Sequence, residues 1–301
     1  ERAMEAATRI KALEVSPLSG SLGAEVRGLS LQEAGPDEAK QIRALLDEHL
    51  VLFFPQQGLT PDEHIVFGNL FGRLEAHPNL QFGGERPEFF ELHAAGGAGA
   101  IADEWHSDLS CEEEPSLLSI LHMVTCPTVG GDTMWANMYK AYEELSPAMR
   151  EFCEGLSALH DAHPHGHPEN MAVHPVVRIN PATGRKSLFV NEHFTRRIVE
   201  LSHYESNALL GYLTNWATSP NFTVRYRWSV GTVAIWDNRY TQHSVLNDFA
   251  GDRVIQRVTV MGDRPEAAAP PRWEPCLAPL SATCRHDRQL QSYLKSRKAA
   301  D

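Results

Sequence analysis

The sequence predicts a mainly β protein with flanking helices. Between residues 116 and 262, short segments rich in β-branched and aromatic residues follow one another closely, which is typical of a sandwich or a barrel. Two stretches inside that region, 138–157 and 202–217, have helical patterns instead. With 301 residues, of which 42% are hydrophobic, the chain is long enough to bury a substantial core.

The first 72 residues are expected to alternate between strands and helices. Thr60 suits a helix N-cap, Pro61 suits the first helical position, and Glu63 completes a capping box. This helix is expected to end near Gly72. The elements expected before it are strands at 10–15 and 22–26, a helix from about residue 36 and a buried strand at 51–54.

The rest of the chain is expected to combine short strands with loops. Residues 81–104 contain two glycine-rich stretches, so we expect a flexible loop that leads to His106. Four histidines lie in a stretch with two prolines and a glycine, which favours a solvated lid loop over a second metal site; they are His160, His163, His165 and His167. The expected strands are 117–121, 133–135, 188–190, 223–228, 233–236 and 254–261.

The end of the chain differs in composition from what precedes it. Residues 267–301 are rich in proline and then in charged residues, and we expect them to pack on the outside with frayed ends. We therefore predict a single domain over residues 1–301, with its core at about 10–265 and a C-terminal extension at 266–301.

Composition disfavours nucleic acid and membranes as partners. The formal net charge is −12, and an acidic surface repels both phosphate backbones and anionic lipids. No apolar run approaches the ~20 residues of a membrane-spanning helix, and the first residues lack the apolar core of a signal peptide. Five scattered cysteines without a CxxC pair are typical of free thiols, so we expect a location in the reducing cytoplasm.

A metal site is predicted from His106, Asp108 and His243. If residues 106–108 form a strand, His106 and Asp108 point to the same face and can reach one metal, and His243 can supply a third ligand. Two histidines and one carboxylate leave three positions open on an octahedral iron(II). The HxD pattern alone is short, however, and any one of 15 histidines is more often a surface or core residue. Trp236, close to His243 in sequence, could shield the metal or simply pack in the core.

Two arginines and a threonine could hold anions beside this metal. Arg253 and Arg257 are four residues apart in an expected strand, so they share a face. A guanidinium can grip a carboxylate or a sulfonate with two parallel hydrogen bonds. Surface salt bridges would explain the same spacing equally well. Thr133 follows the turn at Gly130 and Gly131 and could offer its hydroxyl to a carboxylate.

Several motifs together match a known family. They are residues 105–108 (WHSD), 130–133 (GGDT), 142–146 (YEELS), 190–198 (VNEHFTRRI), 234–243 (AIWDNRYTQH) and Arg257 with 262–263. Their order and spacing over about residues 12–265 resemble the taurine dioxygenase family of iron(II)/2-oxoglutarate oxygenases. Relatives of that family include alkylsulfatase and phenoxyalkanoate-herbicide dioxygenases.

The resemblance implies a fold, cofactors and a set of site residues. The fold is a double-stranded β-helix (jelly roll) flanked by helices, and the cofactors are Fe(II), 2-oxoglutarate as cosubstrate and O2. The implied iron ligands are His106, Asp108 and His243, the implied 2-oxoglutarate residues are Thr133 and Arg253, and the implied substrate residues are His77, Ala102, Phe194 and Arg257. The spacing from His243 to Arg253 (253 − 243 = 10) is one residue shorter than in the taurine enzyme, so the division of roles between the two arginines is open.

Two departures from the family's taurine enzyme bear on the substrate. Ala102 and Leu80 stand where that enzyme has an asparagine and a tyrosine, so polar contacts to taurine would be lost. A larger or less polar substrate is therefore favoured. Asp108 is present, whereas halogenases of related fold lack this carboxylate, so hydroxylation is favoured over halogenation.

The function expected is hydroxylation of a small, anionic organic molecule with release of succinate and CO2. Desaturation or cyclisation by the same cofactors is an alternative within this class. A catalytically silent jelly-roll binding protein and a zinc hydrolase with the same three ligands are alternatives from other classes. The expected partner is a small-molecule substrate, and the chain is expected to form a dimer or tetramer, as relatives often do.

Overall fold

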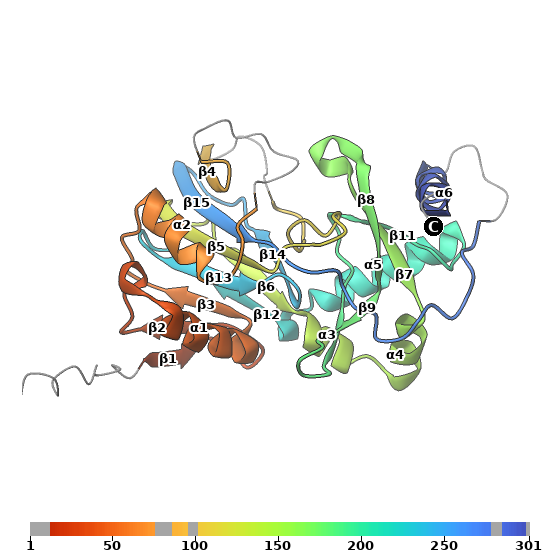
Figure 1. Ribbon diagram of the computed structural model, residues 1–301, viewed down its shortest axis with the longest axis horizontal. Coiled ribbons are helices and arrows are strands. Elements are labelled where there is room, and N and C mark those ends of the chain that lie inside the picture. The colour runs from red at the N-terminus through yellow and green to blue at the C-terminus, as the bar shows by residue number, and fades with distance from the viewer. Residues whose placement is uncertain (1–12, 76–85, 96–101, 278–284, 299–301) are drawn as a thin grey trace, which may run out of the picture.

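A large mixed sheet is the main scaffold of the chain. The computed structural model describes residues 13–75, 86–95, 102–277 and 285–298 (Figure 1). Seven strands form this sheet, all antiparallel to their neighbours except for one parallel pair, the second and third in the sequence. In spatial order they are β1 (Glu14–Pro17), β2 (Ala24–Arg27), β3 (Val51–Phe54), β13 (Val233–Asp237), β5 (Leu118–Thr125), β15 (Asp252–Val260) and β4 (Phe89–Ala95).

Alternating side chains cover the two faces of this sheet. Along β3, Leu52 and Phe54 pack under the helices α1 (Pro36–His49) and α2 (Pro61–Asn69), whereas Val51 and Phe53 point to the other face. On that other face lies a smaller sheet. Its Trp135 packs edge-on against Phe53, with the ring centres 5.2 Å apart. The smaller sheet has the order β12 (Thr223–Tyr226), β6 (Thr133–Asn137) and β14 (Thr241–Val245).

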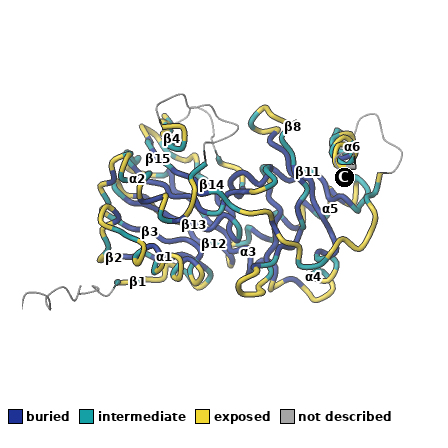
Figure 2. Tube along the Cα trace, in the orientation of Figure 1, coloured by how far each residue is buried: buried dark blue, intermediate teal, exposed yellow. Residues whose placement is uncertain are grey.

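A second body of helices and strands extends the molecule beyond the two sheets (Figure 1). Its core includes Leu188, Val190 and Leu213, all fully buried or nearly so. The helices are α3 (Met138–Glu143), α4 (Pro147–Glu154) and α5 (His203–Ala217), and the strands are β7 (Ser157–Ala162), β8 (His167–Pro175), β9 (Val177–Ile179), β10 (Lys186–Leu188) and β11 (Thr195–Ile198). The last helix, α6 (Arg285–Lys298), packs on this body through Leu290. Figure 2 shows this helix coloured mainly as intermediate and exposed.

The mainly β architecture with flanking helices is confirmed, and so are most N-terminal elements. Thr60 Oγ1 accepts a hydrogen bond from the Glu63 N–H at 3.3 Å, and the Glu63 carboxylate accepts from the Thr60 N–H at 2.8 Å, as the capping box requires. The strand expected at 10–15 is observed as Glu14–Pro17, and residues 10–12 lie outside the described part. None of the helices in the described residues is long and apolar enough to cross a membrane.

Two expectations about local structure were wrong, and a third was incomplete. Residues 89–95, expected within a loop, form β4 because Phe90 and Leu92 pair with the exposed edge of β15 and pack on the core. The helical stretch 138–157 is two helices, since Ser146 caps a new helix at Pro147. The tail packs on the outside as expected, but it also contains α6, which was not predicted because Leu290 alone is fully buried among the side chains that the structure describes there, too weak a periodic signal.

The turn before β6 needs glycine at position 130, and alanine there is expected to destabilise the fold. Gly130 has φ +78°, and an added Cβ would lie 2.4 Å from the Asp248 carbonyl oxygen. Gly184 has a similar φ of +73° but nothing within 4 Å of its Cβ position, so it is a matched control. We expect Gly184→Ala to lower the free energy of unfolding by ~1 kcal/mol through backbone strain, and Gly130→Ala by ~3 kcal/mol through strain and steric clash. Equal losses in urea denaturation would contradict the clash.

Candidate active site

Three buried side chains converge as the sequence predicted. His106, Asp108 and His243 each place one possible ligand atom within 4.8 Å of the other two, and they are the one such group in the described residues. Asp108 Oδ1 lies 3.7 Å from His106 Nε2 and 3.9 Å from His243 Nε2. All three are less than 10% exposed. The spacing of the three atoms suits a single small metal ion.

The backbone brings these residues together in a way that differs from the expectation. His106 and His243 form an isolated antiparallel bridge, with the N–H of each donating to the carbonyl of the other at 3.0 and 2.8 Å. Asp108 lies in a turn rather than a strand, and Leu109 that follows it has φ +56°. The argument from strand alternation was therefore wrong in detail, although the two side chains do meet.

The protonation of the three groups suits metal binding. Burial lowers the pKa of His106 to about 3 and that of His243 to about 4, so both imidazoles are neutral at pH 7. Burial alone would raise the pKa of Asp108, but Arg257 and the two imidazoles hold it well below its usual range. His106 Nδ1 pairs with the Glu104 carbonyl at 2.7 Å, which leaves Nε2 free for a metal.

A chain of hydrogen bonds fixes the Asp108 carboxylate. The Ser119 hydroxyl donates to Asp108 Oδ2 at 2.6 Å, and Asn238 Nδ2 donates to Ser119 Oγ at 2.8 Å. Asn238 is held in turn by Trp236, whose indole N–H donates to Asn238 Oδ1 at 2.9 Å. Sequence reasoning missed Ser119 and Asn238, because a polar residue on a buried strand gives no signal of what it contacts.

The three residues open into a cavity of about 470 Å³. Most of its lining side chains are apolar, among them Leu121, Phe194 and Ile255. Trp236 lies 4.8 Å from the His243 ring, so it shields this histidine from water. The polar or charged side chains in the lining are His106, Asp108, Thr133, His165, His193, His243, Arg253 and Arg257.

Arg253 and Thr133 both line the cavity and are suited to a carboxylate. Arg253 is 4% exposed, and its Nε and one terminal nitrogen have no hydrogen-bond partner in the described residues. Burial lowers its pKa to about 10, so the guanidinium remains charged at pH 7. Thr133 Oγ1 accepts a hydrogen bond from Trp228 at 2.9 Å, which leaves its hydroxyl proton available to an anion.

Arg257 shares this face of β15, as predicted, and neither arginine is a surface residue. Its Nη1 lies 3.2 and 3.3 Å from the two oxygens of Asp108, and its guanidinium lies 5.3 Å from the centre of the Phe90 ring. Its Nε is buried and has no hydrogen-bond partner among the residues that the structure describes. The alternative of two solvent-facing salt bridges is therefore wrong.

Comparisons with known proteins identify the family. Residues 14–259 match the family described as "Taurine catabolism dioxygenase TauD, TfdA family". The chain belongs to this family. It is 36% identical to an alkylsulfatase of Acinetobacter baylyi, over 83% of this chain and 86% of that protein. It is 37% identical to an "Alpha-ketoglutarate-dependent sulfate ester dioxygenase" of Pseudomonas putida, over 84% of this chain and 91% of that protein.

Solved structures agree with this TauD/TfdA assignment. A taurine dioxygenase from Burkholderia xenovorans has a TM-score of 0.76 and 38% identity, over 84% of this chain and 92% of that one. The structure of a protein named AAD-2, in complex with Mn(II) and N-oxalylglycine, has a TM-score of 0.74 and 26% identity. The jelly-roll prediction is thereby confirmed.

The remaining substrate residues expected of a TauD/TfdA protein are only partly visible. Phe194 lines the cavity with its ring 6.4 Å from that of His106, and Ala102 lines it at a left-handed φ of +62°. His77 and Leu80 lie outside the described residues.

The solvated lid loop expected at 160–167 is confirmed only in part, because His163 and His167 are exposed and the turn at 163–165 lines the cavity, whereas His160 is not in a loop. His160 is fully buried on β7, and its Nδ1 lies 3.1 Å from Ser110 Oγ. His165 lines the cavity together with His193, which sequence reasoning did not single out. A histidine in a sequence rich in glycine and proline looks solvated, and only the fold shows that the turn at 163–165 bends over the cavity.

Proposed function

We propose that this TauD/TfdA dioxygenase uses iron(II), 2-oxoglutarate and O2 to hydroxylate a small organic anion, with release of succinate and CO2. The observation that carries this proposal is Arg253, a buried cation on the wall of the cavity that the three candidate ligands share, with two nitrogens that have no hydrogen-bond partner in the described residues. Leaving a buried charge without a partner is expensive, so such a side chain is best explained by an anionic ligand.

The donor set supports iron(II) bound by His106, Asp108 and His243. Two neutral imidazoles and one carboxylate leave open positions on an octahedral ion, whereas a zinc hydrolase with the same ligands would leave Arg253 and Thr133 unexplained. When bound, iron(II) supplies the site at which 2-oxoglutarate and O2 react. Arg253 and Thr133 would hold the distal carboxylate of 2-oxoglutarate.

The protein's own contribution is to hold the metal ligands in place, to orient the substrate and to exclude water. Ser119 keeps the Asp108 carboxylate turned toward the two histidines through the 2.6 Å hydrogen bond. Trp236 and Phe194 keep the surroundings of the ligands dry, which strengthens every charge interaction in the cavity. Arg257 would orient the substrate, because its Nε, which no described residue pairs with, can donate to an anion close to the iron site.

We propose an organic sulfate ester as the substrate class. The two relatives above are named for sulfate ester chemistry, and a largely apolar cavity with Arg257 suits an alkyl or aryl body with an anionic head. Ala102 offers no side-chain hydrogen bond to the amine of taurine. Hydroxylation of the carbon that bears the sulfate would give an unstable product, which loses hydrogen sulfate and leaves an aldehyde.

A substrate panel tests this proposal. Purified protein with iron(II), 2-oxoglutarate and O2 would be given alkyl sulfates, alkyl sulfonates, aryloxy acids and taurine, and succinate would be measured. We expect kcat/KM for an alkyl sulfate to exceed that for taurine by about 100-fold, because a lost polar contact and an unfilled apolar wall together change binding by ~3 kcal/mol. The parent alcohols are the control for the anionic head. Taurine as the best substrate, or alcohols equal to their sulfates, would refute the sulfate ester assignment.

A further inference from the structure

Two histidines form a wall of the cavity that the reaction described above does not use. His165 Nε2 lies 3.3 Å from His193 Nε2, and both side chains line the cavity. His193 is also hydrogen-bonded to Glu104 at 2.7 Å, and its ring lies 5.5 Å from that of the candidate ligand His106. The position of this pair therefore affects the space beside the metal site.

The two histidines come from different segments, and one buried carboxylate joins these segments. Asp161 is fully buried at the end of β7, and its Oδ1 accepts from the His163 N–H at 3.1 Å and from Arg196 Nε at 2.9 Å. Arg196 in turn donates to the carbonyl of His193. One carboxylate thus holds the turn that carries His165 and, through Arg196, the loop that carries His193.

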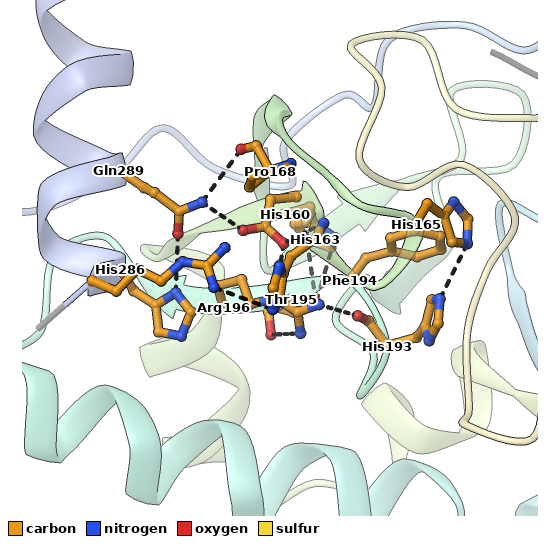
Figure 3. A network of polar contacts seen from close by, with 12 residues as sticks. His160, His163, His165, Pro168, His193, Phe194, Thr195, Arg196, His286 and Gln289 are labelled. Carbon is orange, nitrogen blue, oxygen red and sulfur yellow. Dashed lines mark hydrogen bonds and ion pairs between the residues drawn. The ribbon is translucent and has the colours of Figure 1, made fainter. Parts of the chain in front are cut away.

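The other oxygen of this carboxylate is held from the C-terminal helix. Gln289 on α6 donates from Nε2 to Asp161 Oδ2 at 2.9 Å and to the Pro168 carbonyl at 3.3 Å. His286, one turn earlier, pairs with Gln289 Oε1 at 3.1 Å and so orients the amide. Figure 3 shows Gln289 and His286 on the helix at one side of this network and His165 and His193 at the other.

Helix α6 has its own anchors to the body, independent of Gln289. Arg197, which is 1% exposed, forms an ion pair with Asp287 at 2.7 Å. Leu290 is fully buried against Leu159 and Val199. The helix would therefore stay docked when Gln289 is replaced, and the effect of the amide can be measured separately.

We propose that α6 braces the substrate pocket, with Gln289 and Asp161 as positioning residues for the His165–His193 wall. The helix lies outside residues 14–259, which match the family, so this support is an addition by the C-terminal extension to the family core. A fully buried carboxylate needs all its donors, and loss of one loosens the groups held by the others. That the two histidines border a substrate pocket rests on the proposed function. That α6 supports them through Gln289 and Asp161 does not.

Hydrogen exchange of the metal-free protein tests the brace directly. In Gln289→Ala, amides in peptides that cover 161–167 and 192–195 are expected to exchange about tenfold faster, because one hydrogen bond to a buried charge is lost. Gln289→Glu is expected to accelerate exchange further, since it sets a second carboxylate against Asp161. Gln291→Ala, the same change two residues along α6, is the matched control and is expected to leave both peptides unchanged. Equal exchange in the Gln289 and Gln291 variants, or Gln289→Glu milder than Gln289→Ala, would overturn the brace.

Kinetics with the best substrate of the panel test the effect on the pocket. Gln289→Ala is expected to raise the KM for substrate about fivefold and to form more succinate per substrate consumed, with the KM for 2-oxoglutarate within about twofold. An unchanged substrate KM together with faster exchange would show that the wall does not shape the pocket, and would overturn that part of the proposal. If the wild-type protein consumes no substrate of the panel, the proposed function fails, and the exchange comparison still decides the brace.

Discussion

Replacing His106 with alanine is expected to lower turnover by at least about 1,000-fold, because even residues that only support metal ligands typically contribute 10- to 100-fold. The variant keeps Asp108 and His243 but loses the third candidate ligand, while Asp108 retains its contact with Arg257. Iron bound per protein after reconstitution and the rate of succinate formation measure the effect.

The matched control for this variant is His203→Ala. His203 begins α5, pairs with Asn207 and is not among the residues that line the cavity. We expect full iron content and normal turnover from it. If His106→Ala binds iron as the wild type does and keeps more than about a tenth of its rate, His106 is not a ligand and the site must be assigned again.

Arg253→Ala is expected to raise the 2-oxoglutarate concentration needed for half-maximal rate by about 100-fold, since removing one partner of a buried charge pair costs ~2–5 kcal/mol. The substrate KM should change little. Arg257→Ala is expected to do the reverse, with a higher substrate KM and little change for 2-oxoglutarate. Initial rates with each concentration varied in turn separate the two variants, and an exchange of the two results would mean that the arginines have exchanged roles.

The burial of Arg253 also leads to a prediction about the thermal stability of the Arg253→Ala variant. Because its Nε and one terminal nitrogen lack hydrogen-bond partners within the described part of the chain, we infer that the folded protein without cosubstrate bears a poorly compensated buried charge. Arg253→Ala is therefore expected to leave the melting temperature of the cosubstrate-free protein unchanged or higher, and to abolish the stabilisation that 2-oxoglutarate gives the wild type. A marked loss of stability without cosubstrate would indicate a structural role instead.

The sequence predicted which residues form the site better than it predicted the backbone conformation that brings them together. The positions of His106, Asp108 and His243 followed from motif order, and the shared face of Arg253 and Arg257 followed from strand alternation. The turn at Asp108 did not, because a bridge of two backbone hydrogen bonds to His243, made across 137 residues (243 − 106 = 137), decides the local conformation. Long-range pairing of this kind leaves no local pattern.

The same reason explains the other departures. The strand at 89–95 contains two alanines and a histidine and gains its order from pairing with β15 rather than from its own propensity. His160 and His165 looked equivalent in sequence, yet one is buried beside Ser110 and the other lines the cavity. The single-domain boundaries, the cytoplasmic location and the dimer or tetramer stay predictions.

The most direct test of the central claim is the visible spectrum of the anaerobic protein. With iron(II) bound to His106, Asp108 and His243, 2-oxoglutarate is expected to chelate the metal and produce a weak metal-to-ligand charge-transfer band. The band should be absent from His106→Ala and present in His203→Ala, and it should need far more 2-oxoglutarate in Arg253→Ala. Protein confirmed to contain iron that shows no such band, or a band that survives in His106→Ala, would contradict the account.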